Sequence, residues 1–133
     1  MFRTRVALVA LGLAVCTMSA QAQQSKESEQ PRPMERFAGE VSLIVKDGVL
    51  QRLRVTLRNW GIPNQSRIED FPEQGLRVIE LRGGEAVTTI DGAEYKRAVG
   101  DFWVVPPGAK MSLVTQNDFA ALQVLSIQPA AQQ

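Results

Sequence analysis

The stretch "AVGDFWVVPPGAKMSLVTQND", residues 98–118, decides the fold. It holds a short apolar run, "FWVV", between a Gly-Asp pair and a Pro-Pro-Gly triplet, followed by a second short run over Met111–Thr115. Gly100 suits a bend that needs a positive φ, Pro106 ends a strand because it has no N–H to donate, and Gly108 lets the chain reverse. This punctuation predicts short strands joined by tight turns.

The same two-residue period appears upstream, in "VLQRLRVTLRNW" at residues 49–60. Leu53, Val55 and Leu57 alternate with a second set, Arg52, Arg54, Thr56 and Arg58. Alternation of this kind is typical of a strand with one apolar and one polar face. We expect the three arginines to lie on a solvated outer face of the sheet, with binding of an anion by them as the alternative.

Further runs predict about eight strands in an antiparallel sandwich or jelly roll. They are Leu76–Leu81, Ala86–Ile90, Tyr95–Val99, Phe102–Val105, Met111–Thr115 and Ala120–Ile127. Turn pairs such as Asp47-Gly48, Asp91-Gly92 and Asn117-Asp118 separate most of them. Because "FWVV" is apolar at four successive positions, it is expected to be covered on both faces, by the core and by a partner or loop. The long connection at residues 61–75 is expected to carry a binding site.

Residues 76–127 resemble the cupin superfamily, whose second motif runs G-x5-P-x-G-x2-H-x3-N. Gly100, Pro106 and Gly108 match its glycine, proline and glycine, whereas Met111 takes the histidine position and Thr115 the asparagine position. The preceding "GGEAVTTIDGAEYKRAVGD" is similar to the central hairpin of the family. The resemblance implies an all-β chain with an antiparallel double-stranded β-helix, the small jelly-roll barrel of cupins.

The first cupin motif, G-x5-H-x-H-x3,4-E-x6-G, supplies the remaining metal ligands of the family. Aligned on Gly83 or Gly84, its glutamate position falls on Leu76 or Arg77, and its histidine positions fall within residues 69–73, "EDFPE". The chain contains no histidine. Because imidazole is the preferred ligand for iron, copper, zinc and nickel, the metal-dependent chemistry of cupins is predicted to be absent, and no cofactor is expected.

Carboxylates offer the alternative metal site. Glu69, Asp70 and Glu73 could hold calcium or magnesium through oxygen atoms, or they are solvated loop charges. Because the chain has no histidine and its single cysteine, Cys16, precedes the folded region, neither a Ser-His nor a Cys-His pair can form there. We predict no catalytic residue and a small-ligand or protein-binding module. The alternative is an unusual cupin-type enzyme that uses these carboxylates, with or without a metal.

Arginine, tryptophan and methionine supply the candidate ligand-binding residues: Trp60, Arg67, Arg77, Arg82 and Met111. Guanidinium groups suit carboxylate, phosphate or sulfate, and an indole ring gives a sugar or an aromatic ring a flat surface, so the expected ligand is small and either anionic or sugar-like. Trp60 at the start of the long loop is the ligand-facing candidate, whereas Trp103 is expected in the core or in a dimer contact. For Met111, core packing is the competing interpretation.

The ends of the chain differ from its middle. Arg3 and Arg5 precede an apolar run, Val6 to Val15, and "AQA" at residues 20–22 completes the pattern of a signal peptide. The run is too short to span a bilayer. We therefore expect cleavage after residue 22, a disordered tether at 23–36, a cupin-like barrel at 37–128 and a flexible tail at 129–133. Lipidation of Cys16 is the alternative, although Val15 is unfavourable before a lipidated cysteine.

Cleavage would leave 133 − 22 = 111 residues with a net charge of 13 − 14 = −1. A nearly neutral domain has no electrostatic reason to bind nucleic acid. We expect a periplasmic or secreted protein without a transmembrane segment in its mature form. The cupin resemblance also implies a homodimer, since many single-domain cupins pair through their outer sheet, and the apolar "FWVV" strand favours the same arrangement.

Overall fold

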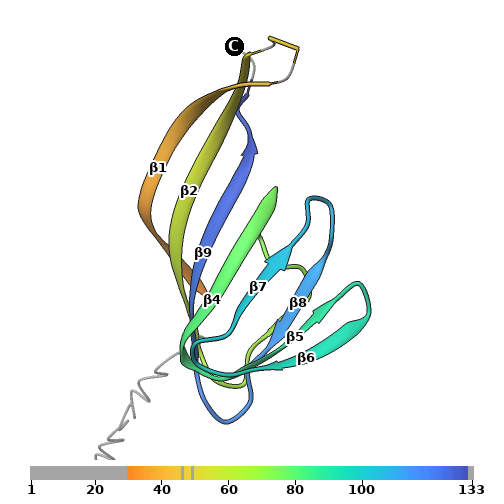
Figure 1. The fold of residues 1–133 in the computed structure, drawn as a ribbon. Helices are drawn as coiled ribbons and strands as arrows, with labels where there is room; N and C mark the ends of the chain where they lie inside the picture. The colour runs from red at the N-terminus through yellow and green to blue at the C-terminus, as the bar shows by residue number, and fades with distance from the viewer. Residues whose placement is uncertain (1–29, 46, 49, 132–133) are drawn as a thin grey trace, which may run out of the picture.

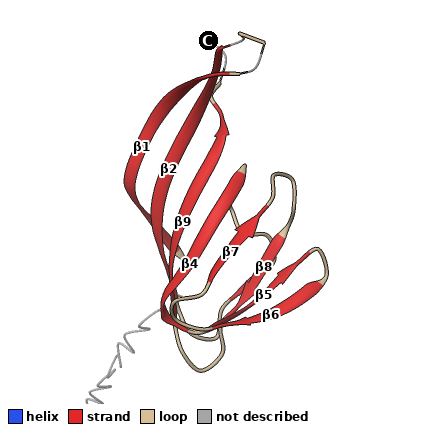
Figure 2. Cartoon of the chain, in the orientation of Figure 1, coloured by secondary structure: helices blue, strands red, loops and turns tan. Residues whose placement is uncertain are grey.

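The computed structural model describes residues 30–45, 47–48 and 50–131, which form nine strands and no helix (Figure 2). The strands are β1 (Arg32–Ile44), β2 (Leu50–Ile62), β3 (Arg67–Ile68), β4 (Leu76–Gly84), β5 (Ala86–Ile90), β6 (Ala93–Arg97), β7 (Phe102–Val105), β8 (Met111–Val114) and β9 (Ala120–Pro129). The predicted signal peptide and residues 23–29 of the predicted tether lie outside the described residues. Within the described part, no helix is long and apolar enough to cross a membrane.

Two antiparallel sheets face each other (Figure 1). The larger has the strand order β1-β2-β9-β4-β7 and the smaller the order β3-β8-β5-β6. The last strand, β9, lies between β2 and β4, so strands far apart in sequence close the sheet. This is the predicted antiparallel double-stranded β-helix. The core between the sheets is made of Trp60, Ile62, Phe71, Ile79, Leu81, Ala86, Trp103, Val105, Met111, Leu113, Ala120, Leu122 and Val124.

Turn chemistry places the strands where the sequence predicts them. The bounds of β5 and β7 agree with the predicted ones, and β6 begins two residues before its predicted start. Asp91 and Gly92 join β5 to β6 with φ values of 46° and 84°. Two successive positive φ values match the right-handed twist of a hairpin, which explains why an Asp-Gly pair stands there.

The predicted ends of the folded region need correction. Residues 32–36, expected in a disordered tether, belong to β1 and pair with β2 from Arg32 opposite Gly61 onwards. At the other end, Pro129 is the last residue of β9, and the N–H of Ala130 donates to the carbonyl of Arg52 at 2.9 Å. The polar composition of both segments gave no sign of a strand. Their backbones pair with β2, and this pairing does not require apolar side chains.

The predicted faces of β2 are inverted. Thr56, Trp60 and Ile62 are buried against the core, and Arg58 lies on the same side of the strand, whereas Leu53, Val55 and Leu57 lie on the side turned away from the smaller sheet. Arg52 and Arg54 therefore point to the inner side and not to a solvated outer face. They are exposed because β1, β2 and β9 run on past the smaller sheet (Figure 1).

Candidate functional site

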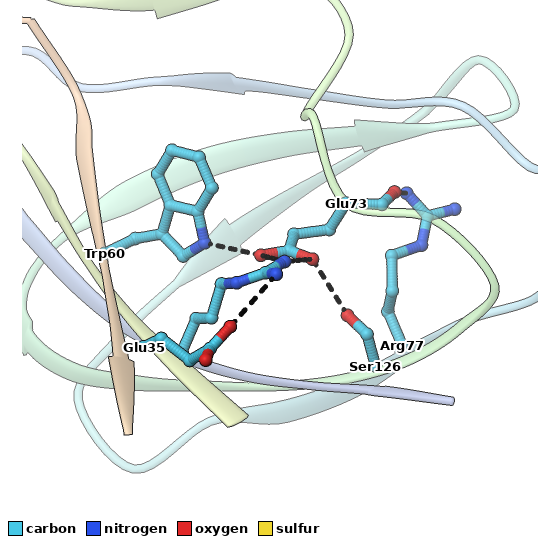
Figure 3. A network of polar contacts seen from close by, with 6 residues as sticks. Glu35, Trp60, Glu73, Arg77 and Ser126 are labelled. Carbon is cyan, nitrogen blue, oxygen red and sulfur yellow. Dashed lines mark hydrogen bonds and ion pairs between the residues drawn. The ribbon is translucent and has the colours of Figure 1, made fainter. Parts of the chain in front are cut away.

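An open groove of about 470 Å³ lies between the start of β1 and the loop that follows β3. Its lining includes Trp60 from β2, Arg67 from β3, and the loop carboxylates Glu69 and Asp70, together with the prolines 31, 33 and 72. The structure thus brings together two of the five predicted ligand-binding residues, Trp60 and Arg67. Figure 3 shows the network of polar contacts around Glu73, which lies next to Trp60.

The centre of that network is the carboxylate of Glu73, whose side chain is only 2% exposed. It accepts hydrogen bonds from Arg58 Nη1 at 3.0 and 3.2 Å, from Trp60 Nε1 at 3.0 Å and from Ser126 Oγ at 3.1 Å (Figure 3). Arg58 also donates to Glu35 of β1 at 3.4 Å. The hydrogen bond to Glu73 raises the pKa of Arg58 despite partial burial. The network ties the long loop to strands β1, β2 and β9.

Trp60 is the floor of the groove and not an open platform. Its ring packs against Phe71 with the centroids 4.9 Å apart at 56°, and only 6% of the residue is exposed. Because its N–H is already used by Glu73, the indole has neither a free face nor a free donor for a sugar. The expectation that Trp60 stacks on a ligand is therefore not supported by the geometry.

The three carboxylates of the alternative metal site do not converge. Glu73 points into the core, whereas Glu69 forms an ion pair with Arg67 at the surface. Within residues 30–45, 47–48 and 50–131, no three His, Cys, Asp or Glu side chains are placed to hold a metal ion together. The structure therefore provides no assembled carboxylate site for the enzyme alternative.

Arg77, predicted to bind a ligand, is buried and holds two loops together. Its Nη1 donates to the carbonyl of Glu73 at 2.9 Å, and its Nη2 donates to the carbonyls of Ala109 at 2.6 Å and Pro106 at 3.4 Å. Its Nε is buried without a hydrogen-bond partner among the described residues. Burial lowers the pKa of Arg77, while the charges of Asp70 and Glu73 oppose this shift.

The two remaining predicted ligand residues lie away from the groove. Arg82 is exposed on β4 and donates to the side chain of Gln123 at 3.2 Å. Met111 is fully buried, and its sulfur accepts a hydrogen bond from Trp103 Nε1 at 3.3 Å. The residue at the cupin histidine position is thus a core residue, as the competing interpretation had it.

The sequence did not single out Arg97 on the edge strand β6, which packs against two aromatic rings. The guanidinium carbon of Arg97 lies 4.6 Å from the ring centroid of Tyr95 and 4.3 Å from that of Trp103. Its Nε donates to Thr88 Oγ1 at 2.9 Å. Burial lowers the pKa of Arg97, and the charges of Asp101 and Tyr95 oppose the shift. The only sequence feature that could have indicated this contact is the spacing of Tyr95 and Arg97, which places both on one face of a predicted strand.

The outer sheet face, defined as the side of the larger sheet turned away from the smaller one, is apolar. Cross-strand pairing aligns one apolar residue from each strand into a row: Phe37, Leu57, Leu125, Val78 and Val104. A second row holds Gly39, Val55, Ile127 and Leu76. Phe37 is 54% exposed and Val104 is 54% exposed.

This face also corrects the expectation for "FWVV". Trp103 and Val105 are buried, but Phe102 and Val104 are 66% and 54% exposed. Nothing in the described part of the chain covers them. Among the described residues, the strand therefore has one core face and one open apolar face.

Solved structures similar to this chain share the fold. A cupin domain of an XRE-family transcriptional regulator from Enterobacter cloacae superposes with a TM-score of 0.58 and 10% identity, covering 77% of this chain and 100% of that one. A cupin conserved-barrel protein from Salinispora arenicola gives a TM-score of 0.53 at 15% identity, covering 72% and 75% of the two chains.

A third structure, an RmlC-like protein with a double-stranded β-helix from Methanocaldococcus jannaschii, gives a TM-score of 0.50 at 16% identity and covers 70% of this chain and 87% of that one. By sequence, no family model matches the chain, and no curated protein matches it either. At these identities the likeness concerns the fold alone.

Proposed function

We propose that this chain, a double-stranded β-helix of the cupin fold, is an exported, non-catalytic protein-binding module that pairs with a second copy of itself through the outer sheet face. The observation that carries the proposal is the row of five apolar side chains that crosses all five strands of the larger sheet, from Phe37 on β1 to Val104 on β7.

The size of the face supports an interface. Neighbouring strands lie about 4.8 Å apart, so a row across five strands spans roughly 20 Å. Monomeric proteins rarely expose a contiguous apolar patch beyond a few hundred Å², and a specific interface needs about 800 Å² from each partner. Additional exposed apolar residues extend the rows on β1, namely Val41 and Leu43 at 45% each.

The charge distribution favours a second copy as the partner. The two apolar rows carry no charge, so they can face themselves across a two-fold axis without leaving an unpaired ion. Polar groups follow at the border, where Glu80 and Arg82 of β4 carry opposite signs. An apolar centre with a polar rim is the usual anatomy of a protein interface.

Export is supported by the N-terminal pattern, two arginines, an apolar run and "AQA" at residues 20–22. The described domain contains no disulfide, since the only cysteine of the chain is Cys16. The described residues that line the groove include no assembled metal site or Ser-His or Cys-His pair. Binding through the outer sheet face is therefore the activity that we propose.

The test is light scattering of protein recovered from the exported fraction, whose intact mass should correspond to residues 23–133. We expect about twice the monomer mass at micromolar concentration. Val104→Lys places a charge in the centre of the proposed contact and should give a monomer, because two desolvated ammonium groups would face the apolar rows.

Val99→Lys is the matched control, because Val99 is 60% exposed but lies outside the outer sheet face, between β6 and β7. This variant should remain dimeric. A monomeric parent protein at about 100 μM, or a Val104→Lys variant that stays dimeric, would rule the proposal out.

A further inference from the structure

Arg97 is held in one position by three neighbours. Tyr95 and Trp103 place their rings within 4.6 and 4.3 Å of its guanidinium carbon, and Thr88 accepts from its Nε at 2.9 Å. Cation–π contacts of this kind restrict a long side chain that otherwise samples many rotamers. The aromatic rings cover the guanidinium, and the Nε is occupied, so the edge with the two Nη nitrogens is what remains open to a ligand.

This edge has no partner among the described residues. Neither Nη1 nor Nη2 of Arg97 takes part in a hydrogen bond there, and neither is among the fully buried polar atoms. Asp101, whose charge acts on Arg97, uses its Oδ2 to accept from the N–H of Ala98 at 2.8 Å. A partly desolvated cation without a bonded counter-ion is poorly compensated, which favours an anion from solution.

The position and charge of the guanidinium set the kind of anion. The guanidinium lies on the inner face of β6, because it contacts Thr88 and Trp103, which are both buried. It carries a single positive charge, which one carboxylate neutralises. Two parallel Nη–H groups match the two oxygens of a planar carboxylate in one plane.

We propose that Arg97 is the anchor of a binding site for a small monocarboxylate, at the edge between β6 and β7. Tyr95 and Trp103 orient the guanidinium, Thr88 fixes its rotation through Nε, and the carboxylate accepts from Nη1 and Nη2. The site is separate from the groove at Trp60 and does not depend on pairing through the outer sheet face.

The experiment is a titration of the full mature protein with sodium acetate, compared with sodium chloride at the same ionic strength. Two-dimensional proton–nitrogen NMR spectra follow the chemical shifts of the Nε–H of Arg97 and of the indole N–H of Trp103. We expect saturable shifts with acetate and none that saturate with chloride. Arg97→Lys keeps the charge but loses the planar fork, so acetate affinity measured at Trp103 should fall at least tenfold, roughly the difference between a bidentate and a single charged contact.

Arg36→Lys is the matched control, because Arg36 is an exposed arginine on β1 that lines neither site, and this variant should leave acetate affinity unchanged. Thr88→Val keeps the side-chain shape, removes the Nε acceptor and should weaken acetate about threefold, as expected for one hydrogen bond. Thermal unfolding verifies that each variant is folded. Equal shifts with chloride and acetate, or undiminished acetate binding by Arg97→Lys, would refute the site.

Discussion

The carboxylate of Glu73 accepts from side chains on two different strands, Arg58 and Trp60 on β2 and Ser126 on β9. A buried carboxylate is tolerated only where donors replace the lost water, and here four contacts from three residues do so. The loop is also held on the side of β8, where the N–H of Phe71 donates to the carbonyl of Met111 at 2.8 Å and the N–H of Gln65 donates to that of Gln116 at 3.0 Å. Glu73 is therefore the residue whose side chain ties the long loop to the larger sheet, through β2 and β9.

Replacing Glu73 by glutamine should lower the free energy of unfolding by about 2 kcal/mol, because the hydrogen bonds lose their charge and one amide N–H faces existing donors. Urea unfolding followed by tryptophan fluorescence measures the change. Glu69→Gln is the control, since Glu69 is 73% exposed and pairs only with exposed Arg67, and it should unfold like the parent. Equal midpoints for the two variants would show that the network adds no stability.

At the same scale, the sequence could not distinguish the three acids of "EDFPE". Their side chains are chemically similar, and the partners that select Glu73 for burial come from residues 15 and 53 positions away in the chain. The same holds for Arg77, whose acceptors are backbone carbonyls of two loops and so leave no trace in side-chain composition. Residue types indicated candidate binding residues in and around the long loop, and only long-range pairing decided which of them are buried.

At the scale of elements, the strands bounded by turn residues were predictable in position, whereas β1, β3 and the faces of β2 were not. Proline, glycine and Asp-Gly pairs end strands for local reasons, so β5 and β7 were predicted with their observed bounds. The face of β2 depends on register, and a shift of one residue moves every side chain to the other side. The apolar set Leu53, Val55 and Leu57 looked like core, but the buried side instead holds Thr56, Arg58 and Trp60.

The junction of β4 with β9 depends on Gly84, which has a φ of +75°. A Cβ added there would overlap the carbonyl oxygen of Phe119, so Gly84→Ala must displace the backbone just before β9. We expect a loss of more than about 3 kcal/mol of unfolding free energy, the range of severe backbone effects. Denaturant unfolding of purified protein provides the measurement.

Gly92→Ala separates strain from overlap, because Gly92 has a φ of +84° but nothing within 4 Å of an added Cβ. That variant should lose about 1 kcal/mol, the cost of a left-handed conformation for a residue with a side chain. If both variants lost the same amount, the close approach to Phe119 would not matter for stability.

At the scale of the whole molecule, the predicted fold agrees with the structure, while the outer sheet face could not be recognised from sequence. An apolar strand face means core when a second sheet covers it and interface when none does, and the pattern of residues is the same in both cases. Phe102 and Val104 show the ambiguity, since they were expected under cover and are open in the described chain.

Pairing through that face should make thermal stability depend on protein concentration. A tenfold change in concentration corresponds to about 1.4 kcal/mol, and unfolding entropy is roughly 2 cal/mol/K per residue, so a dimer of this size should melt about 3 °C higher for each tenfold increase. Scanning calorimetry from about 5 to 500 μM would span two such steps. Val104→Lys should melt at one temperature throughout, because a monomer gains nothing from mass action. A parent protein whose midpoint is equally constant would mean that the outer sheet face stays open in solution.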